Sequence, residues 1–119
     1  MSRHGLALVR AIVDGMMDAE KLDAIVYPTA TRRPSRRDAD PGASRNGVSA
    51  VRIANMTGYP DLIVPAGFTG TGLPVCLSFL GPAFSEPRLL ALGYAFEQAT
   101  KARRTPVHTP PLPGETFAY

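Results

Sequence analysis

The sequence predicts an incomplete α/β fold: a mixed sheet segment with one hairpin, two long helices and one short helix. Three observations predict it. Apolar residues recur at three- and four-residue steps in two segments, which is the spacing of amphipathic helices. Two apolar runs, 62–64 and 73–80, are joined through the stretch PAGFTGTG, which indicates a hairpin whose strands are covered on both faces. The 11 glycines and 12 prolines among 119 residues favour turns, which argues against an all-helical bundle.

The first predicted helix covers residues 3–20, and its apolar positions are Leu6, Val9, Ile12, Val13, Met16 and Met17. Gly15 weakens such a helix by about 1 kcal/mol relative to alanine, so we expect packing to stabilise it. A short strand is predicted over residues 22–27. Ile25 and Val26 are β-branched there, and Pro28, which has no backbone N–H to donate, ends the strand.

Residues 29–48 are predicted to form a long loop rich in arginine and proline. Between residues 31 and 52 six arginines face two aspartates, which gives a local charge of +4, against +3 for the whole chain. Four of these side chains could bind a polyanion: Arg32, Arg33, Arg36 and Arg37. Asp38 and Asp40 lie beside them and no aromatic residue is interleaved to stack a base, so a solvated loop is favoured over nucleic-acid binding.

The remaining elements follow from capping and periodicity. A short helix over residues 49–56 is closed by Thr57 and Gly58, with the glycine free to adopt the left-handed conformation. Ser85 is predicted to cap a final helix whose inner stripe consists of Leu89, Leu92, Phe96 and Ala99. Residues 105–119 contain a proline-rich stretch and are expected to form an extended tail.

Composition excludes several classes of site and compartment. The single cysteine, Cys76, cannot form an internal disulfide, and no Cys/His cluster has metal-ligand spacing, so we expect no metal and no cofactor. No apolar stretch is long enough for a membrane span and no leader pattern is seen, so a reducing cytoplasm is expected. Cys76 lies in a predicted strand, where a thiol behaves as a small buried apolar group. No GxSxG stretch is present, and His4 and His108 lie near opposite ends of the chain.

The segment 53–81, IANMTGYPDLIVPAGFTGTGLPVCLSFLG, resembles the C-terminal region of the amidase signature family. Members carry an N-x-T/A-G-x-P step into a strand ending VPAG, a turn, GLPVGLQ-like residues and a final helix. The positions that fall in register are Asn55, Thr57, Gly58, Pro60, Val64, Pro65, Gly67, Gly72, Leu73, Pro74, Gly81, Phe84 and Glu86. The resemblance extends over residues 22–106. Cys76 stands where the family commonly has glycine, and Ser78 where it commonly has glutamine.

The resemblance implies an amide hydrolase that uses a Ser-cisSer-Lys triad. That triad lies upstream of the matching region in such enzymes, and this sequence contains no GGSSGG-like stretch. No catalytic residue is therefore assigned. The resemblance places four residues on the substrate side of a pocket, namely Pro28, Thr29, Val48 and Arg52. A small amide would bind only together with the missing N-terminal part.

Residues 1–119 are therefore expected to form a single partial domain, the C-terminal segment of an amidase, inactive alone. Its role would be to complete the sheet and one wall of the pocket. Two apolar strands with few helices to cover them leave a sheet edge exposed, so self-association or marginal stability is expected. Two alternatives remain open: a non-catalytic interaction module that pairs with itself or with an amidase, and a polyanion-binding protein that uses the loop arginines.

Overall fold

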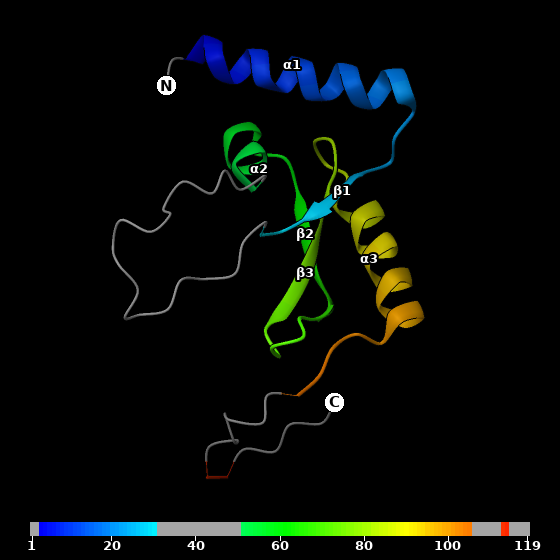
Figure 1. Cartoon of the computed structure of the whole chain (residues 1–119). Coiled ribbons are helices and arrows are strands. Elements are labelled where there is room, and N and C mark those ends of the chain that lie inside the picture. Colours follow the sequence, from blue (N-terminus) through cyan, green and yellow to red (C-terminus); the bar gives the residue numbers. More distant parts are fainter. Residues whose placement is uncertain (1–2, 31–50, 106–112, 115–119) are drawn as a thin grey trace, which may run out of the picture.

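The computed structural model describes residues 3–30, 51–105 and 113–114. It confirms the α/β class with one hairpin, two long helices and one short helix. Three antiparallel strands form one sheet in the order β1-β3-β2 (Figure 1). In chain order the elements are α1 (Arg3–Glu20), β1 (Ile25–Pro28), α2 (Val51–Thr57), β2 (Asp61–Phe68), β3 (Pro74–Leu80) and α3 (Glu86–Thr100). The predicted loop over residues 31–48 and most of the predicted tail lie outside the described residues.

Helix α1 has the predicted bounds and lies across one end of the sheet, next to α2 (Figure 1). Its inner side buries Val13 and Met17. Two polar contacts tie it to the segment that follows α2: Arg10 Nε donates to the Thr57 carbonyl at 2.7 Å, and the Tyr59 hydroxyl donates to the Asp14 carboxylate at 2.7 Å. Packing and these contacts therefore stabilise a helix that glycine weakens.

Strand β1 is displaced from its predicted position. It begins at Ile25 and includes Pro28, which pairs with Leu77 at the edge of the sheet. Proline is tolerated on an edge strand because its missing N–H removes no bond from the interior of the sheet. The prediction that Pro28 ends the strand was therefore wrong by one residue, and Leu22 instead closes α1 by donating its N–H to the Met17 carbonyl.

Strands β2 and β3 form the predicted hairpin, with a bulge between Pro65 and Gly67. Thr69 closes the turn, because its N–H donates to the Leu73 carbonyl and its hydroxyl accepts from the Leu73 N–H; Gly72 sits there at φ 83°. On one face the hairpin packs against α3 (Figure 1). The other face is covered only in part, because Ser78 is fully buried whereas Ile63 is 48% exposed. The expected cover on both faces is therefore incomplete within the described residues.

Helix α3 supplies the core together with the sheet. Leu89 is buried with Val64 and Phe79, and partly buried apolar side chains surround them: Ala24, Leu62, Leu77, Leu92 and Phe96. Ser85 occupies the N-cap position as predicted, but its hydroxyl donates to the Pro82 carbonyl at 2.7 Å and makes no capping bond. The predicted capping contact was therefore wrong. A Cβ on Gly93 would lie 2.4 Å from Leu62 Cδ2, so glycine lets α3 approach β2 closely.

The short helix α2 begins at Val51 in the structure, and residues 49 and 50 of its predicted span lie outside the described residues. Gly58 has the predicted left-handed conformation, at φ 71°, and its N–H donates to the Ala54 carbonyl at 2.7 Å. Thr57 is fully buried, and its hydroxyl donates to the Ile53 carbonyl at 2.8 Å. The Thr-Gly pair thus ends the helix and turns the chain into β2.

Candidate functional site

A series of polar side chains crosses all three strands on the face opposite α3. Tyr27 on β1 lies opposite Ser78 on β3, and Asp61 begins β2. The Tyr27 hydroxyl reaches diagonally across β3 and donates to Asp61 Oδ2. At the other end, the hydroxyls of Thr29 and Ser78 are hydrogen-bonded at 2.9 Å. We call these four residues, Thr29, Ser78, Tyr27 and Asp61, the cross-strand polar cluster.

Burial determines the protonation of this cluster. Ser78 is fully buried, and the Tyr27 side chain is half-buried on the same face. Burial, followed by the hydrogen bond to Asp61, raises the pKa of Tyr27 to about 12, so the tyrosine is a neutral donor at physiological pH. Asp61 Oδ1 is also buried and has no hydrogen-bond partner within the described part of the chain. The cluster therefore fixes geometry, and it holds no group poised as a general base.

Two of the four predicted substrate-side residues lie beside this cluster. Thr29 follows β1, and its N–H donates to the Cys76 carbonyl at 3.1 Å. Pro28 precedes it and is exposed. Arg52 lies on a separate element, exposed in the first turn of α2, and Val48 lies outside the described residues. The structure thus brings Pro28 and Thr29 to the positions of Cys76 and Ser78, the two departures from the family pattern.

The motif residues occupy architectural positions. Pro60 leads into β2, Pro65 lies at its bulge, Pro74 begins β3 and Glu86 begins α3, while Asn55 is exposed on α2. Positive φ angles occur at three motif glycines, Gly58, Gly67 and Gly72. At Gly81 a Cβ would lie 2.1 Å from Ser85 Oγ and 3.1 Å from Leu89 Cδ2, so this position needs glycine for close packing. The motif therefore specifies turns and packing in this part of the chain.

Sequence reasoning missed Tyr27 and Asp61 as partners. They are 34 residues apart, and their contact depends on the register of both with β3. An aspartate at the start of an apolar strand was the one available signal, because a carboxylate at the start of a sheet strand needs a donor nearby. Only the strand order could have identified that donor.

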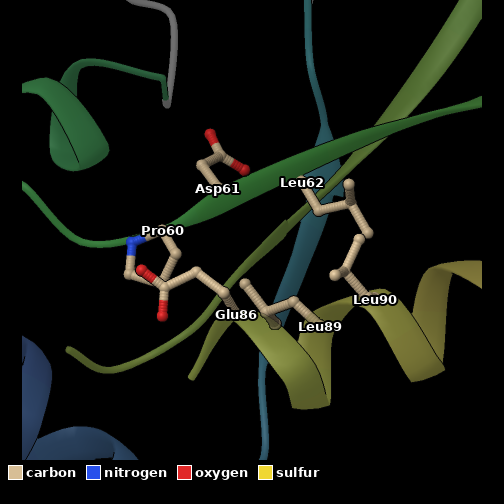
Figure 2. Close-up of a pocket in the computed structure, with 6 residues that line it drawn as sticks. All are labelled: Pro60, Asp61, Leu62, Glu86, Leu89 and Leu90. Carbon is tan, nitrogen blue, oxygen red and sulfur yellow. The ribbon is translucent and has the colours of Figure 1, made fainter. Parts of the chain in front are cut away.

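A second surface feature lies on the α3 side of the sheet. A groove of about 270 Å³ separates the start of β2 from α3 and is lined by Pro60, Asp61, Leu62, Glu86, Leu89 and Leu90. Figure 2 shows Leu62, Leu89 and Leu90 gathered between strand and helix, with the Asp61 carboxylate turned away from them. The groove is apolar and offers no reactive group.

No metal site and no membrane-spanning helix occurs in the described segments. Over these residues, no cluster of three or more His, Cys, Asp or Glu side chains could hold a metal ion. None of the helices described is long and apolar enough to cross a membrane. Fold and site together define a structural segment of an α/β protein, with a buried polar cluster on one sheet face and an apolar groove on the other.

Comparisons with known proteins identify that protein class. The family model described as Amidase matches residues 2–90. The chain belongs to the amidase family. A probable amidase of Arabidopsis thaliana is 36% identical over 106 residues, and the match covers 89% of this chain and 16% of that protein. A glutamyl-tRNA(Gln) amidotransferase polypeptide of Desulforudis audaxviator is 38% identical over 95 residues, which cover 76% of this chain and 19% of that polypeptide.

Solved structures agree with this assignment. The native peptide amidase of Stenotrophomonas maltophilia superposes with a TM-score of 0.67 at 38% identity, over 85% of this chain and 20% of that structure. An amidase family protein of Bacillus anthracis gives a TM-score of 0.65 at 28% identity, over 86% of this chain and 17% of that one. The chain thus spans a fifth or less of the length of these relatives, and the predicted family is confirmed.

Proposed function

We propose that this chain is a segment of an amide hydrolase, which converts a carboxylic amide and water to an acid and ammonia or an amine. The observation that carries the proposal is the amidase match over residues 2–90, combined with the small share of each relative that the chain spans. The segment's role is structural: it completes the sheet and forms one wall of the substrate pocket. We further propose that it does not turn over substrate alone.

The cross-strand polar cluster supports a structural role. Ser78 is its buried serine, and the Ser78 hydroxyl is hydrogen-bonded to the Thr29 hydroxyl, which is not a base. The nucleophile and its activating groups would come from the remainder of an amidase polypeptide. The wall itself is proposed to include Pro28 and Thr29, held by the cluster, together with Val48 and Arg52.

A chimera tests the proposed function. The segment of the Stenotrophomonas maltophilia peptide amidase that matches this chain is replaced by residues 1–119, and ammonia release from a peptide amide is measured. We expect the chimera to hydrolyse the amide, whereas the isolated 119-residue chain and the peptide amidase without its segment both give background rates. A folded but inactive chimera would contradict the proposal. So would turnover by the isolated chain that persists after every serine is replaced.

A non-catalytic interaction module is the second candidate, and exposed apolar side chains favour it. Leu8, Ile12 and Met16 lie on one side of α1 and are each at least 45% exposed. Recovery of an intact amidase bound to the isolated chain would support this function. The polyanion hypothesis rests on Arg32, Arg33, Arg36 and Arg37, which lie outside the described residues. A cytoplasmic location stays a prediction.

A further inference from the structure

The groove between β2 and α3 continues onto an exposed apolar surface. Leu89 is 1% exposed and faces the core, whereas its neighbour Leu90 is 60% exposed and lines the groove. One turn further, Tyr94 is 65% exposed. Residues four apart lie on the same side of a helix, so Leu90 and Tyr94 form one strip (Figure 2 shows Leu90 beside Leu62). Helix α3 is thus apolar on two sides, which is typical of a helix that is buried on both.

Strand addition is disfavoured over much of the adjacent sheet edge. β2 is an outer strand, but Pro65 has no N–H to donate and the bulge between Pro65 and Gly67 breaks the regular spacing. The groove lies beside Pro60 and Leu62, before this irregularity. A partner would therefore contact this region mainly by inserting apolar side chains against Leu62, Leu89 and Leu90.

The relatives indicate which partner covers this surface. The two solved structures are at least 28% identical to this chain and share its fold, and the matched region is only 20% or less of their length. We propose that the β2–α3 groove and the strip of Leu90 and Tyr94 form the docking surface for an apolar segment of the remaining amidase polypeptide. This inference rests on the proposed function, and it assigns the side of the segment that the rest of the enzyme covers.

Paired substitutions in the chimera test the docking surface. Leu90→Asp places a carboxylate on the strip, and Ala95→Asp places the same charge on another exposed side of the same helix. In the chimera we expect Leu90→Asp to lower Tm by about 5 °C or more, because a buried unpaired charge is strongly destabilising. Ala95→Asp should shift it by less than about 2 °C. In the isolated chain both substitutions should shift Tm by less than about 2 °C, since both sites are exposed there.

The outcomes separate this inference from the proposed function. A folded, active chimera in which Leu90→Asp and Ala95→Asp have the same Tm overturns the docking surface and leaves the proposed function intact. A discrete dimer of the isolated chain that Leu90→Asp dissociates in sedimentation experiments also overturns it, because a second copy would then be the occupant. An insoluble or inactive parent chimera contradicts the proposed function, and the inference falls with it.

Discussion

Among single residues, Tyr27 has the largest predicted effect on stability outside the apolar core. Its hydroxyl donates to Asp61, whose other oxygen is buried without a partner among the residues described. Tyr27→Phe would leave both carboxylate oxygens unpaired, so we expect the free energy of unfolding to fall by about 1 to 3 kcal/mol. Urea denaturation followed by circular dichroism measures this change. Tyr94→Phe is the matched control, because Tyr94 is mostly exposed; equal effects of the two changes would refute the prediction.

The same hydroxyl makes stability depend on alkaline pH. Tyr27 has a pKa of about 12 in the folded chain against 10.0 for an ordinary tyrosine, so the folded state holds this proton more tightly. Its contribution is fully present below pH 10 and is lost as pH rises through about 12. Urea midpoints measured between about pH 9 and pH 12 should therefore fall more steeply in the parent than in Tyr27→Phe. Parallel curves would exclude this linkage.

Tyr59 needs its own control in that experiment. The hydrogen bond to Asp14 is the main cause that raises the pKa of Tyr59, although the residue is largely accessible. Its contribution has the same sign as that of Tyr27, and solvent screening weakens it. Tyr59→Phe should thus change the alkaline limb less than Tyr27→Phe does.

For the helices, glycine separates intrinsic propensity from packing. Gly15 in α1 has open space around it, whereas a Cβ at Gly93 in α3 would lie 2.4 Å from Leu62 Cδ2 and 3.3 Å from Val64 Cγ1. Gly15→Ala should stabilise the chain by about 0.5 to 1 kcal/mol. Gly93→Ala gains the same propensity but overpacks the core, which costs about 1 to 3 kcal/mol.

Thermal unfolding of the two variants measures this difference directly. Because the propensity gain is shared, the difference in free energy of unfolding between them reports the contact of α3 with β2. We expect Gly93→Ala to be the less stable variant by at least about 1 kcal/mol. If both substitutions stabilise equally, Leu62 moves into the adjoining groove without cost and the close approach is not required.

Element by element, local patterns predicted what depends on near neighbours. The apolar repeat of α1 predicted its bounds, and the glycine at the end of α2 has the expected left-handed conformation. β1 was misplaced because whether a proline can remain in a strand depends on its place at the edge of the sheet. Ser85 occupies the cap position but its hydroxyl bonds backward to Pro82, and the sequence does not indicate which of the nearby backbone groups that hydroxyl selects.

The candidate site divides in the same way. Pro28 and Thr29 could be chosen from the family pattern, and Ser78 stood out as a departure from it. The Tyr27–Asp61 contact could not be predicted, because it requires β1 and β2 to lie on opposite sides of β3. The apolar groove also depends on how closely Gly93 brings α3 to β2.

For the whole molecule, exposed apolar surface predicts association. Leu8, Ile12 and Met16 form a solvent-facing stripe on α1, opposite in role to the buried Val13. Replacing the three stripe residues with glutamine should lower the association seen by sedimentation at rising concentration, while the helical circular dichroism is retained. Val13→Gln is the contrasting variant, since a buried amide without a partner should unfold the chain. A parent chain that stays monomeric at all concentrations would contradict this prediction.

The strand order has a consequence for how the chain is made. β3 is the central strand, yet the ribosome synthesises it last, after both strands that pair with it. During synthesis the hairpin of β2 and β3 can close through a short turn, but β1 must then be recovered across 49 residues, the separation of Thr29 and Ser78. Until residue 80 has left the exit tunnel, β1 and β2 emerge as unpaired apolar strands, so the nascent chain is most exposed to aggregation or chaperone binding before its middle strand arrives.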